Sequence, residues 1–405
     1  MLSWINQFNI FCFLDNQQYA RQPHQYECIA GAGVLDFIES GNLKDLDEFL
    51  VKQKGSWIFG HLSYKLKEQI HQIWSQKSDP IGFAPFYFFK PSAVLILEAG
   101  SIKILADDPQ KIFDEILIQK PGTENSIHEF SITNRYAKET YLKKIEDIQS
   151  HILHGDCYEI NFCQEFFAEN IELTPLHLYR RLIEESPNPF CAFYRLNEKF
   201  LICASPERFL MKQANRLISQ PIKGTIKRDL TDTYLDKRLA NLLMNSKKDR
   251  SENVMIVDLV RNDLSKICHF DTVKVKELFG IYDFPQVYHM ISTIEGEVHP
   301  QILFSEIITS TFPMGSMTGA PKHRVMQLID QYEDSERGIF SGSVGYIDPQ
   351  GDFDLNVVIR SMMYNSANRF LSWKAGSGIT FYSEPQNEWE ECLLKASAIK
   401  KVLTG

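Results

Sequence analysis

The sequence lacks the features that mark thiolate-metal, nucleotide-binding and membrane-spanning proteins. None of its 8 cysteines belongs to a C-x-x-C pair, which argues against a zinc site or a thioredoxin-like motif. It contains no G-x-G-x-x-G and no G-x-x-x-x-G-K-[ST] segment, so nucleotide-binding folds lose their usual support. No run approaches the roughly 18 apolar residues of a membrane span, and the N-terminus does not resemble a signal peptide. We therefore expect a cytoplasmic protein with buried free thiols and no membrane contact.

An excess of positive charge is also missing. The chain has 43 Lys and Arg against 52 Asp and Glu, a formal net charge of -9. A nucleic-acid-binding surface would show a basic stripe, so we expect no nucleic-acid partner. The negative net charge does not exclude a small anionic substrate, because its site needs only local positive charge. With 405 residues, 44% of them hydrophobic, the chain can build one large core or two moderate ones.

Strand-like runs and amphipathic helices alternate irregularly along the chain. We expect strands at 8–14, 56–64, 94–105 (two), 158–167, 190–194, 200–204, 342–347, 354–363 and 369–375, and helices at 65–76, 136–153, 233–244, 322–332 and 388–402. Hairpin-length links such as 348–352 favour an α+β protein with antiparallel sheets over a doubly wound parallel sheet. The polar stretch Lys120 to Asn125 is the best candidate linker. It separates regions 1–125 and 126–405, which we expect to form one compact unit.

Two acidic pairs point to a metal site. A strand predicted at 378–383 leads into a helix that places Glu388, Glu391 and Lys395 on one face. Two carboxylates one turn apart suit a hard divalent cation. The alternative for this helix is a solvated charged face. Asp249 and Glu252 repeat the spacing just before an apolar run, where acidic groups are costly unless they are paired or metal-bound.

Lys223 is the sharpest single signal. It lies between Ile222 and Gly224, with Thr225 beyond, where backbone N–H groups and a hydroxyl can approach a ligand closely. A lysine becomes a nucleophile when desolvation or positive neighbours lower its pKa. The alternative is a solvated lysine in a common turn.

Two further side chains could act on protons. Glu207 ends an apolar strand, where a raised pKa would make it a proton donor, although an ordinary turn glutamate is the alternative. His289 lies in a strand-like run, where most histidines are satisfied core residues. The segment 311–322 leads into a helix with Pro321 in its first turn, and helix N-termini attract anions.

Taken in order, these segments resemble the chorismate-utilising enzymes, which include anthranilate, aminodeoxychorismate, isochorismate and salicylate synthases. The resemblance is firm from about Tyr136 to Leu403 and looser over residues 1–125. It implies a fold of two large antiparallel sheets packed together and flanked by helices, with the active site between the sheets.

The resemblance also implies a role for each candidate. Glu252 and Glu391 match magnesium ligands, with Asp249 and Glu388 in support, and the Mg²⁺ binds the ring carboxylate of chorismate. Glu207 matches the general acid at the C4 hydroxyl, and His289 matches a histidine beside that edge of the ring. The residues that match substrate contacts are Arg360, Lys395, Thr225, Gly224, Gly376 and Gly378.

Two positions select a reaction within the family. Isochorismate and salicylate synthases carry a water-activating lysine where this chain has Glu159, so water is a poor candidate nucleophile. Anthranilate synthases have alanine where this chain has Lys223, and the lysine form resembles aminodeoxychorismate synthases. The implied reaction is attack of Lys223 on C2, then attack of ammonia on C4, giving 4-amino-4-deoxychorismate for para-aminobenzoate and folate synthesis.

Two alternatives stay open. One is an anthranilate synthase component I, which aminates C2 with loss of pyruvate, and the other is a catalytically silent regulatory or binding subunit. We find no glutaminase segment, so the resemblance implies that a separate glutamine amidotransferase subunit supplies the ammonia. Asn253 stands where many relatives have histidine, an exchange that bears on the support of the metal ligands.

Overall fold

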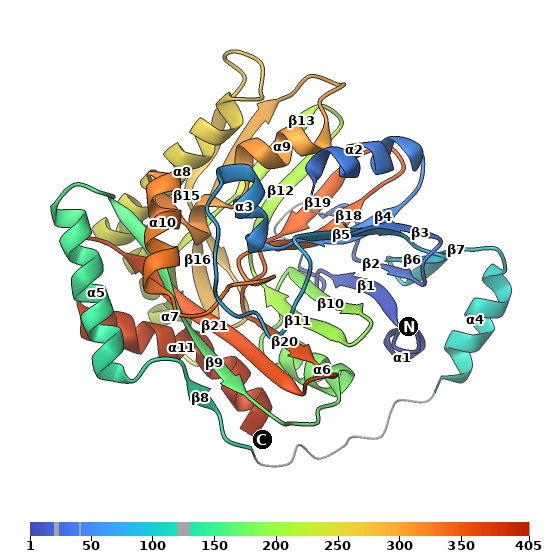
Figure 1. Ribbon diagram of the computed structural model, residues 1–405, viewed down its shortest axis with the longest axis horizontal. Coiled ribbons are helices and arrows are strands. Elements are labelled where there is room, and N and C mark those ends of the chain that lie inside the picture. Colours follow the sequence, from blue (N-terminus) through green and yellow to red (C-terminus); the bar gives the residue numbers. More distant parts are fainter. Residues whose placement is uncertain (20–23, 40–41, 120–129, 405) are drawn as a thin grey trace.

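Antiparallel strands build two large sheets, as the hairpin-length links predict. The computed structural model describes residues 1–19, 24–39, 42–119 and 130–404 (Figure 1). The strand pairings in both sheets are antiparallel. The predicted α+β class with two large antiparallel sheets is therefore confirmed. The predicted linker, residues 120–125, lies outside the described residues.

Among the described residues, sheet A has eleven strands. Its order is β17 (Gly319–Ala320), β9 (Glu159–Ala168), β21 (Phe370–Ile379), β20 (Ser361–Asn365), β11 (Lys199–Ser205), β10 (Phe190–Leu196), β1 (Ile10–Asp15), β2 (Cys28–Ala32), β6 (Ala93–Glu98) and β7 (Ser101–Leu105), with β8 (Thr133–Asn134) beside β9.

Sheet B contains ten strands within the described part of the chain. Its order is β14 (Ile222–Lys227), β16 (Val287–Glu297), β13 (Arg216–Gln220), β12 (Arg208–Gln213), β19 (Phe353–Asn356), β18 (Ser343–Ile347), β4 (Ile58–Leu62), β5 (Phe86–Lys90) and β3 (Asp36–Ile38), with β15 (Lys274–Asp283) beside β16.

Helices cover the outer faces of both sheets (Figure 1). They are α1 (Leu2–Ile5), α2 (Leu43–Lys52), η1 (Tyr64–Leu66), α3 (Lys67–His71), α4 (Pro109–Ile118), α5 (Lys138–Leu153), α6 (Pro175–Glu185), α7 (Thr233–Asn245), α8 (Lys247–Ser265), α9 (Phe304–Thr311), η2 (Gly315–Met317), α10 (Lys322–Tyr332) and α11 (Pro385–Thr404). Helices α5, α6 and α11 pack together over sheet A, and α7 and α8 pack on sheet B. No helix of the described chain is both long and apolar enough to cross a membrane.

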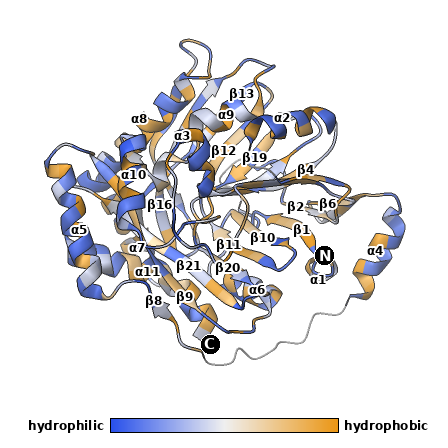
Figure 2. Ribbon diagram, in the orientation of Figure 1, coloured by the Kyte–Doolittle hydropathy of each residue, from blue (hydrophilic) through white to orange (hydrophobic). Residues whose placement is uncertain are grey.

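The core forms because side chains alternate across each strand. On β1, Cys12 faces the cluster that joins the two sheets, while Phe11 and Phe13 face the cluster under α5, α6 and α11. Figure 2 shows hydrophilic and apolar residues interspersed along α5, and the residues that this helix buries are Tyr141, Ile145 and Ile148. The eight cysteines are free, seven are buried and Cys268 is partly buried, as expected.

The N-terminal region contributes strands to both sheets. Strand β1 pairs with β10 in sheet A, and β4 pairs with β18 in sheet B. Residues from both halves of the sequence therefore share one continuous core between the sheets.

Three predicted elements are wrong in detail. The single strand predicted at 354–363 is two strands, β19 in sheet B and β20 in sheet A, and the chain crosses between the sheets at Val357–Arg360. The strand predicted at 378–383 ends at Ile379, because β21 runs unbroken from Phe370 and a turn follows. The helix predicted at 65–76 ends at His71, where Gln72 takes a left-handed conformation. The predicted helices at 136–153, 233–244, 322–332 and 388–402 are confirmed, with ends shifted by a few residues.

Candidate active site

The candidate site lies where β14, at the edge of sheet B, faces β9, the strand next to the edge of sheet A. Lys223 on β14 of sheet B forms an ion pair with Glu159 on β9 of sheet A. Both side chains are buried, at 10% and 1% exposure. The alternative that Lys223 is a solvated lysine in a turn is therefore wrong. Its ion pair with Glu159 connects the two sheets within the site.

The charge on Lys223 differs from the sequence prediction. Burial alone would lower its pKa, as expected, but the carboxylates of Glu159, Glu252 and Glu207 outweigh burial and raise the pKa above the ordinary lysine value. The prediction of a pKa lowered by desolvation is wrong, because it did not take account of the acidic residues that the fold brings near. In this arrangement Lys223 is held as an ammonium.

Glu207 is a protonatable acid next to that ammonium. It follows β11 and is almost fully buried, at 4% exposure. Burial raises its pKa to about 7, and this rise persists although Ser316, the backbone N–H of Ile222 and the charge of Lys223 all act to lower it. The predicted direction of the shift is confirmed. At neutral pH a large fraction of Glu207 therefore carries a proton that it can donate.

The acidic residues of α8 and α11 gather around one lysine. Nζ of Lys248 lies 3.5 Å from Oε1 of Glu388 and 4.0 Å from Oε1 of Glu252. The charge of Glu391 also acts on Lys248. Glu388 is 1% exposed, so the solvated-face alternative is wrong for this residue. Helices from distant parts of the sequence thus bring their acidic faces together.

The acidic cluster fits a cation by charge and by its unsatisfied oxygen. Within the described residues, no three His, Cys, Asp or Glu side chains are already arranged as a set of metal ligands. However, Oε1 of Glu252 is buried and has no hydrogen-bond partner among the described residues. Burial also raises the pKa of Glu252 to about 7, although the charges of Lys223 and Lys248 act to lower it. A hard divalent ion would satisfy that oxygen.

The remaining acidic residues hold fixed positions beside this cluster. Ser377 donates a hydrogen bond of 2.5 Å to Oε2 of Glu388. Asp249 lies against Gly224, where a Cβ would come 3.0 Å from the Asp249 Cβ. Gly224 has a φ of +99°, so a side chain there would also strain the backbone. The start of α8 can therefore approach β14 only because residue 224 is glycine.

Two cationic side chains, Lys395 and Arg360, lie beside the acidic cluster. Nζ of Lys395 lies 2.6 Å from Oε1 of Glu391 and donates to the carbonyl oxygen of Gly376 at 2.9 Å. Arg360 stands at the crossing between the sheets, with a φ of +52°, and donates to the carbonyl oxygen of Lys395 at 3.2 Å. Arg360 and Lys395 thus come together as anion-binding groups.

The glycines of β21 make room for the charged pair. A Cβ at Gly378 would lie 2.7 Å from Nζ of Lys223 and closer still to the Glu159 carboxylate. A Cβ at Gly376 would lie 2.7 Å from the Cα of Cys163. Neither position can carry a side chain, so backbone lines this wall of the site.

Thr225 and His289 face each other across β14 and β16. Thr225 Oγ1 lies 2.8 Å from Nδ1 of His289. His289 is buried, and burial together with Arg360 and Lys395 lowers its pKa to about 3 although a backbone hydrogen bond at Gly224 opposes the shift. The imidazole is therefore neutral at ordinary pH.

Sequence reasoning missed Lys248 and the contact made by Glu159. The i, i+4 spacing of Lys248 and Glu252 was a local signal for the first, but nothing local connects Glu159 to Lys223, 64 residues away.

Asn253, whose amide replaces the usual histidine, accepts a hydrogen bond of 2.6 Å from Ser292 Oγ on β16. Its side chain thus fastens α8 to sheet B.

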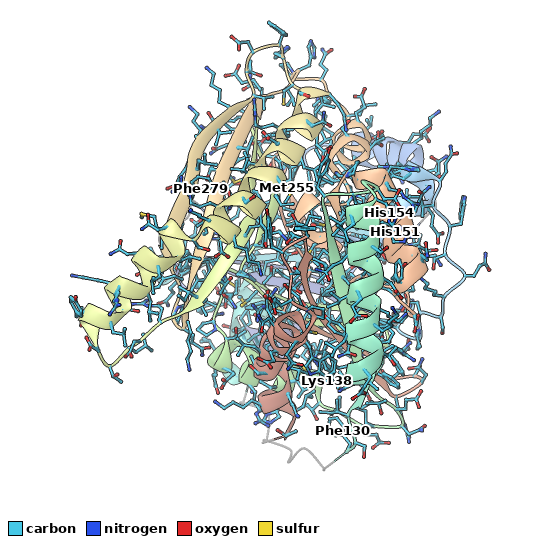
Figure 3. All side chains as sticks on the ribbon, turned by 90° about the vertical axis from the view of Figure 1, so that its left-hand side faces the viewer. Phe130, Lys138, His151, His154, Met255 and Phe279 are labelled. Atoms are coloured by element: carbon cyan, nitrogen blue, oxygen red, sulfur yellow. The ribbon has the colours of Figure 1, made fainter. Side chains whose placement is uncertain are left out.

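Helices frame the site on its outer side. In Figure 3, α5 rises from Lys138 to His151 and His154, and Met255 of α8 is seen near Phe279 of β15. The guanidinium of Arg250 lies 4.5 Å from the centre of the Phe279 ring, which fixes α8 against β15.

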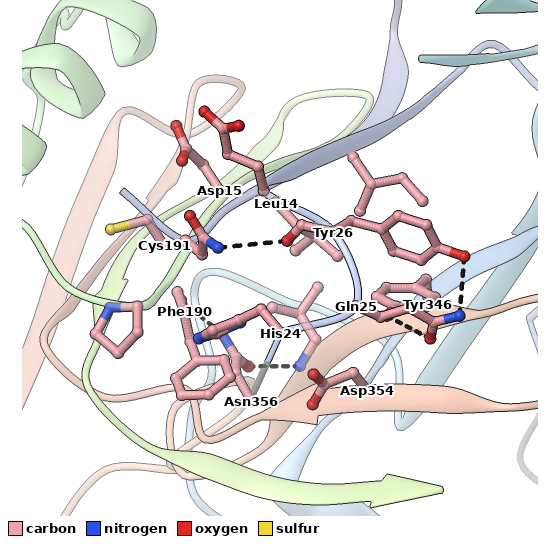
Figure 4. Close-up of a pocket in the computed structure, with 15 residues that line it drawn as sticks. Leu14, Asp15, His24, Gln25, Tyr26, Phe190, Cys191, Tyr346, Asp354 and Asn356 are labelled. Carbon is pink, nitrogen blue, oxygen red and sulfur yellow. Dashed lines mark hydrogen bonds between the residues drawn. The ribbon is translucent and has the colours of Figure 1, made fainter. Parts of the chain in front are cut away.

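A separate pocket, partly open to solvent, lies between β1, β10 and β18 (Figure 4). His24, Tyr26 and Tyr346 are among its lining residues, and the Gln25 amide donates to the Tyr26 hydroxyl at 3.0 Å. None of the candidate site residues is among the described residues that line it. It is thus distinct from the charged site.

Comparison with known proteins connects this geometry to one family. The family model described as chorismate binding enzyme matches residues 13–401. Aminodeoxychorismate synthase component 1 of Escherichia coli is 37% identical over 279 residues, which cover 68% of this chain and 61% of that protein. The chain thus spans about three fifths of that relative. The anthranilate synthase component I-like protein of Synechocystis is 30% identical over 358 residues, 87% of this chain and 73% of that protein.

Solved structures agree on the fold. Anthranilate synthase component I from Streptococcus pneumoniae superposes with a TM-score of 0.82 at 24% identity, and 94% of each chain is covered. The menaquinone-specific isochorismate synthase from Escherichia coli gives a TM-score of 0.80 at 17% identity, covering all of this chain and 91% of that one.

Proposed function

Because this chain belongs to the chorismate-binding enzyme family, we propose that it aminates chorismate at C4 to give 4-amino-4-deoxychorismate. The chain is a chorismate-utilising enzyme similar to aminodeoxychorismate synthase. The observation that carries the finer proposal is the position of Lys223, buried in one site with its ion-pair partner Glu159 and a protonatable acid, Glu207. A nucleophilic amine and a proton donor are the two groups that a two-step substitution needs.

The charged residues divide between binding and proton transfer. Arg360 and Lys395 would bind the carboxylates of the substrate, together with Thr225 and the backbone of Gly224, Gly376 and Gly378. Glu207 would hold its proton at the C4 hydroxyl. His289, which is neutral, would offer a hydrogen bond beside the same edge of the ring.

The acidic cluster would hold Mg²⁺ through Glu252 and Glu391, with Asp249 and Glu388 in support. When bound, the ion neutralises the ring carboxylate of chorismate and so favours its binding next to four acidic side chains. The Oε1 atom of Glu252, which makes no hydrogen bond among the described residues, supports this assignment.

The substitution proceeds in two displacements at this chain's own residues. Neutral Lys223 forms a bond from Nζ to C2 while the C4–O bond breaks, and Glu207 gives its proton to the leaving hydroxide, which departs as water. Ammonia then attacks C4, and the C2–N bond breaks with its electron pair returning to Nζ. Each displacement is easier than a direct exchange of hydroxyl for amine.

A partner is needed for the ammonia. The relatives named component 1 imply a second component in those proteins. We propose that a separate glutamine amidotransferase subunit plays this part here, for para-aminobenzoate and folate synthesis. The eight unpaired cysteines support a reducing compartment, the cytoplasm.

A second candidate is anthranilate synthase component I. The favouring observation is the Synechocystis relative, an anthranilate synthase component I-like protein that matches 87% of this chain. In that reaction C2 is aminated directly and pyruvate leaves, and Lys223 would be a binding residue.

The test is product analysis. Purified protein is incubated with chorismate, MgCl₂ and high ammonium, or with glutamine in place of ammonium, and the products are separated by chromatography. The proposal predicts 4-amino-4-deoxychorismate with ammonium, its conversion to para-aminobenzoate by an added lyase, and little product with glutamine. Fluorescent anthranilate would establish the second candidate instead. No turnover with either nitrogen source would revive the catalytically silent subunit.

A further inference from the structure

Lys223 and Glu159 pose a chemical problem that their own contact can solve. Acidic neighbours hold Lys223 as an ammonium, as described above, and an ammonium has no electron pair with which to attack carbon. We propose that Glu159 removes the ammonium proton of Lys223 before the attack on C2 and returns it after the lysine is released. This proposal rests on the proposed function, because it concerns the same covalent step.

The position of Glu159 suits a proton acceptor. One carboxylate oxygen, Oε1, contacts Nζ of Lys223 directly, so the proton has no distance to travel through solvent. The other oxygen, Oε2, is buried and has no hydrogen-bond partner among the described residues. A buried anionic carboxylate with an unsatisfied oxygen is costly. Because no donor holds Oε2, Lys223 is the group that compensates the charge of this carboxylate.

The other nearby acids are committed to other tasks. Glu207 must carry a proton to the C4 hydroxyl at the moment when Lys223 must lose one, so it cannot accept at that step. Glu252 belongs to the acidic cluster around Lys248. Lys223 itself is only 10% exposed, which leaves little access for water as the base. Glu159 is the remaining carboxylate in contact with the amine within the described residues.

The protons balance over the cycle. Glu159 accepts one proton from Lys223, and neutral Nζ then forms its bond to C2 as Glu207 protonates the leaving hydroxide. Attack of ammonia on C4 breaks the C2–N bond and releases a neutral lysine. That lysine recovers its proton from Glu159, and Glu207 is reprotonated from solvent. No oxidant or other reactant is required.

The test follows formation of the covalent adduct without ammonia. Wild type and Glu159→Gln are mixed with chorismate and MgCl₂ between pH 6 and 9, quenched, and the adduct on intact protein is measured by mass spectrometry. The ratio of the two rates cancels the dependence on Glu207, which both proteins share. With glutamine at 159, Lys223 must lose its proton to solvent, so the ratio should be small at pH 6 and rise by about tenfold per pH unit until the lysine titrates. A ratio that does not change with pH would overturn the proposal.

Glu165→Gln is the matched control. Glu165 lies on the same strand, is 4% exposed and pairs both with buried Lys374 at 3.5 Å and with the partly exposed Arg135 at 2.5 Å. Its substitution removes a buried carboxylate and its ion pairs away from Lys223, so its rate ratio to wild type should stay flat with pH.

A second variant covers a folding failure of Glu159→Gln. In Glu159→Ala, added formate should fit the vacated space and restore adduct formation, whereas chloride at equal ionic strength should not. Absence of rescue would also count against Glu159 as the base. If wild type forms no adduct at any pH, the covalent function itself has failed, which differs from an adduct that forms equally well without Glu159.

Discussion

The Thr225 hydroxyl oxygen lies 2.8 Å from Nδ1 of His289, on directly paired residues of β14 and β16. The contact fixes the orientation of a ring that is 4% exposed. Phe284 packs edge-on against the same ring, with centroids 4.7 Å apart. His289 is thus a neutral hydrogen-bonding group with a fixed orientation, and it does not carry a positive charge.

We expect His289 to keep one protonation state at every pH at which the enzyme works. Its pKa of about 3 lies far below neutrality, because burial and nearby cations disfavour the imidazolium. In ¹⁵N-labelled protein, the ring nitrogen signals that disappear in His289→Gln should not shift between pH 5 and 8. The urea-unfolded chain is the control, where histidines titrate near pH 6.5. A titration midpoint between pH 6 and 7 in the folded protein would contradict this description.

Glu207 should set the alkaline limit of activity. Burial raises its pKa to about 7, so the acid form is abundant below pH 7 and is lost as pH rises through that value. The rate constant kcat for 4-amino-4-deoxychorismate formation should therefore fall tenfold per unit above about pH 7. Glu207→Gln should lower kcat by roughly a hundredfold to ten-thousandfold and abolish this limb. If Glu207→Gln shows the same decline of kcat above about pH 7, another group is responsible for that decline.

Glu252→Gln and Glu391→Gln should each raise the magnesium concentration that supports activity. Both changes keep side-chain volume while removing one negative charge from the cluster, so fold and circular dichroism should stay the same. The loss of one carboxylate ligand should weaken apparent magnesium affinity by about tenfold or more. Magnesium titrations of initial rate measure this directly. Full activity of wild-type protein after treatment with EDTA would show that the cluster does not serve a metal.

Lys248→Met should instead lower the magnesium concentration that supports activity. The ammonium lies 3.5 Å from Glu388 and 4.0 Å from Glu252, where it competes with a cation for the same carboxylates. Because Lys248 is half exposed, solvent weakens the competition, and we expect a gain in magnesium affinity of a few-fold, up to about tenfold. Lys247→Met, at an exposed neighbouring position, is the control and should change nothing. Weaker magnesium binding in Lys248→Met would mean that this lysine supports the site instead.

Local patterns in the sequence predicted much of the fold. Apolar residues at helical spacing predicted α5 and α11, and alternation predicted β9, because these elements each bury one face or both faces in a regular way. The crossing at Val357–Arg360 could not be predicted, since its β-branched run has no glycine or proline to mark a break. Pairing with two different sheets, a tertiary effect, divides that run.

The site was predicted less completely than the fold. Spacing along α8 and α11 predicted which acidic residues share a face, and the structure brings those faces together around Lys248. The charge state of Lys223 was predicted wrongly, because it depends on Glu159, 64 residues earlier and on the other sheet. Contacts across sheets are set by topology, and no local window of sequence contains them.

The identity of the nucleophile is the prediction that separates this chain from anthranilate synthases. With chorismate and MgCl₂ but no ammonia, the wild-type protein should accumulate a covalent adduct, and mass spectrometry of the digested protein should place it on the peptide that contains Lys223. Lys223→Ala should form none, because no amine reaches C2. Lys223→Arg should also form none, since the guanidinium keeps its proton and cannot attack, although it preserves the positive charge beside Glu159.

The pair of variants therefore separates nucleophilic action from charge alone. If Lys223 only balanced the charge of Glu159, Lys223→Arg would keep most of its activity and Lys223→Ala would lose it. If neither an adduct nor a loss of turnover in Lys223→Ala were seen, ammonia would attack the ring directly at C2, and the anthranilate synthase reaction would become the better description of this enzyme.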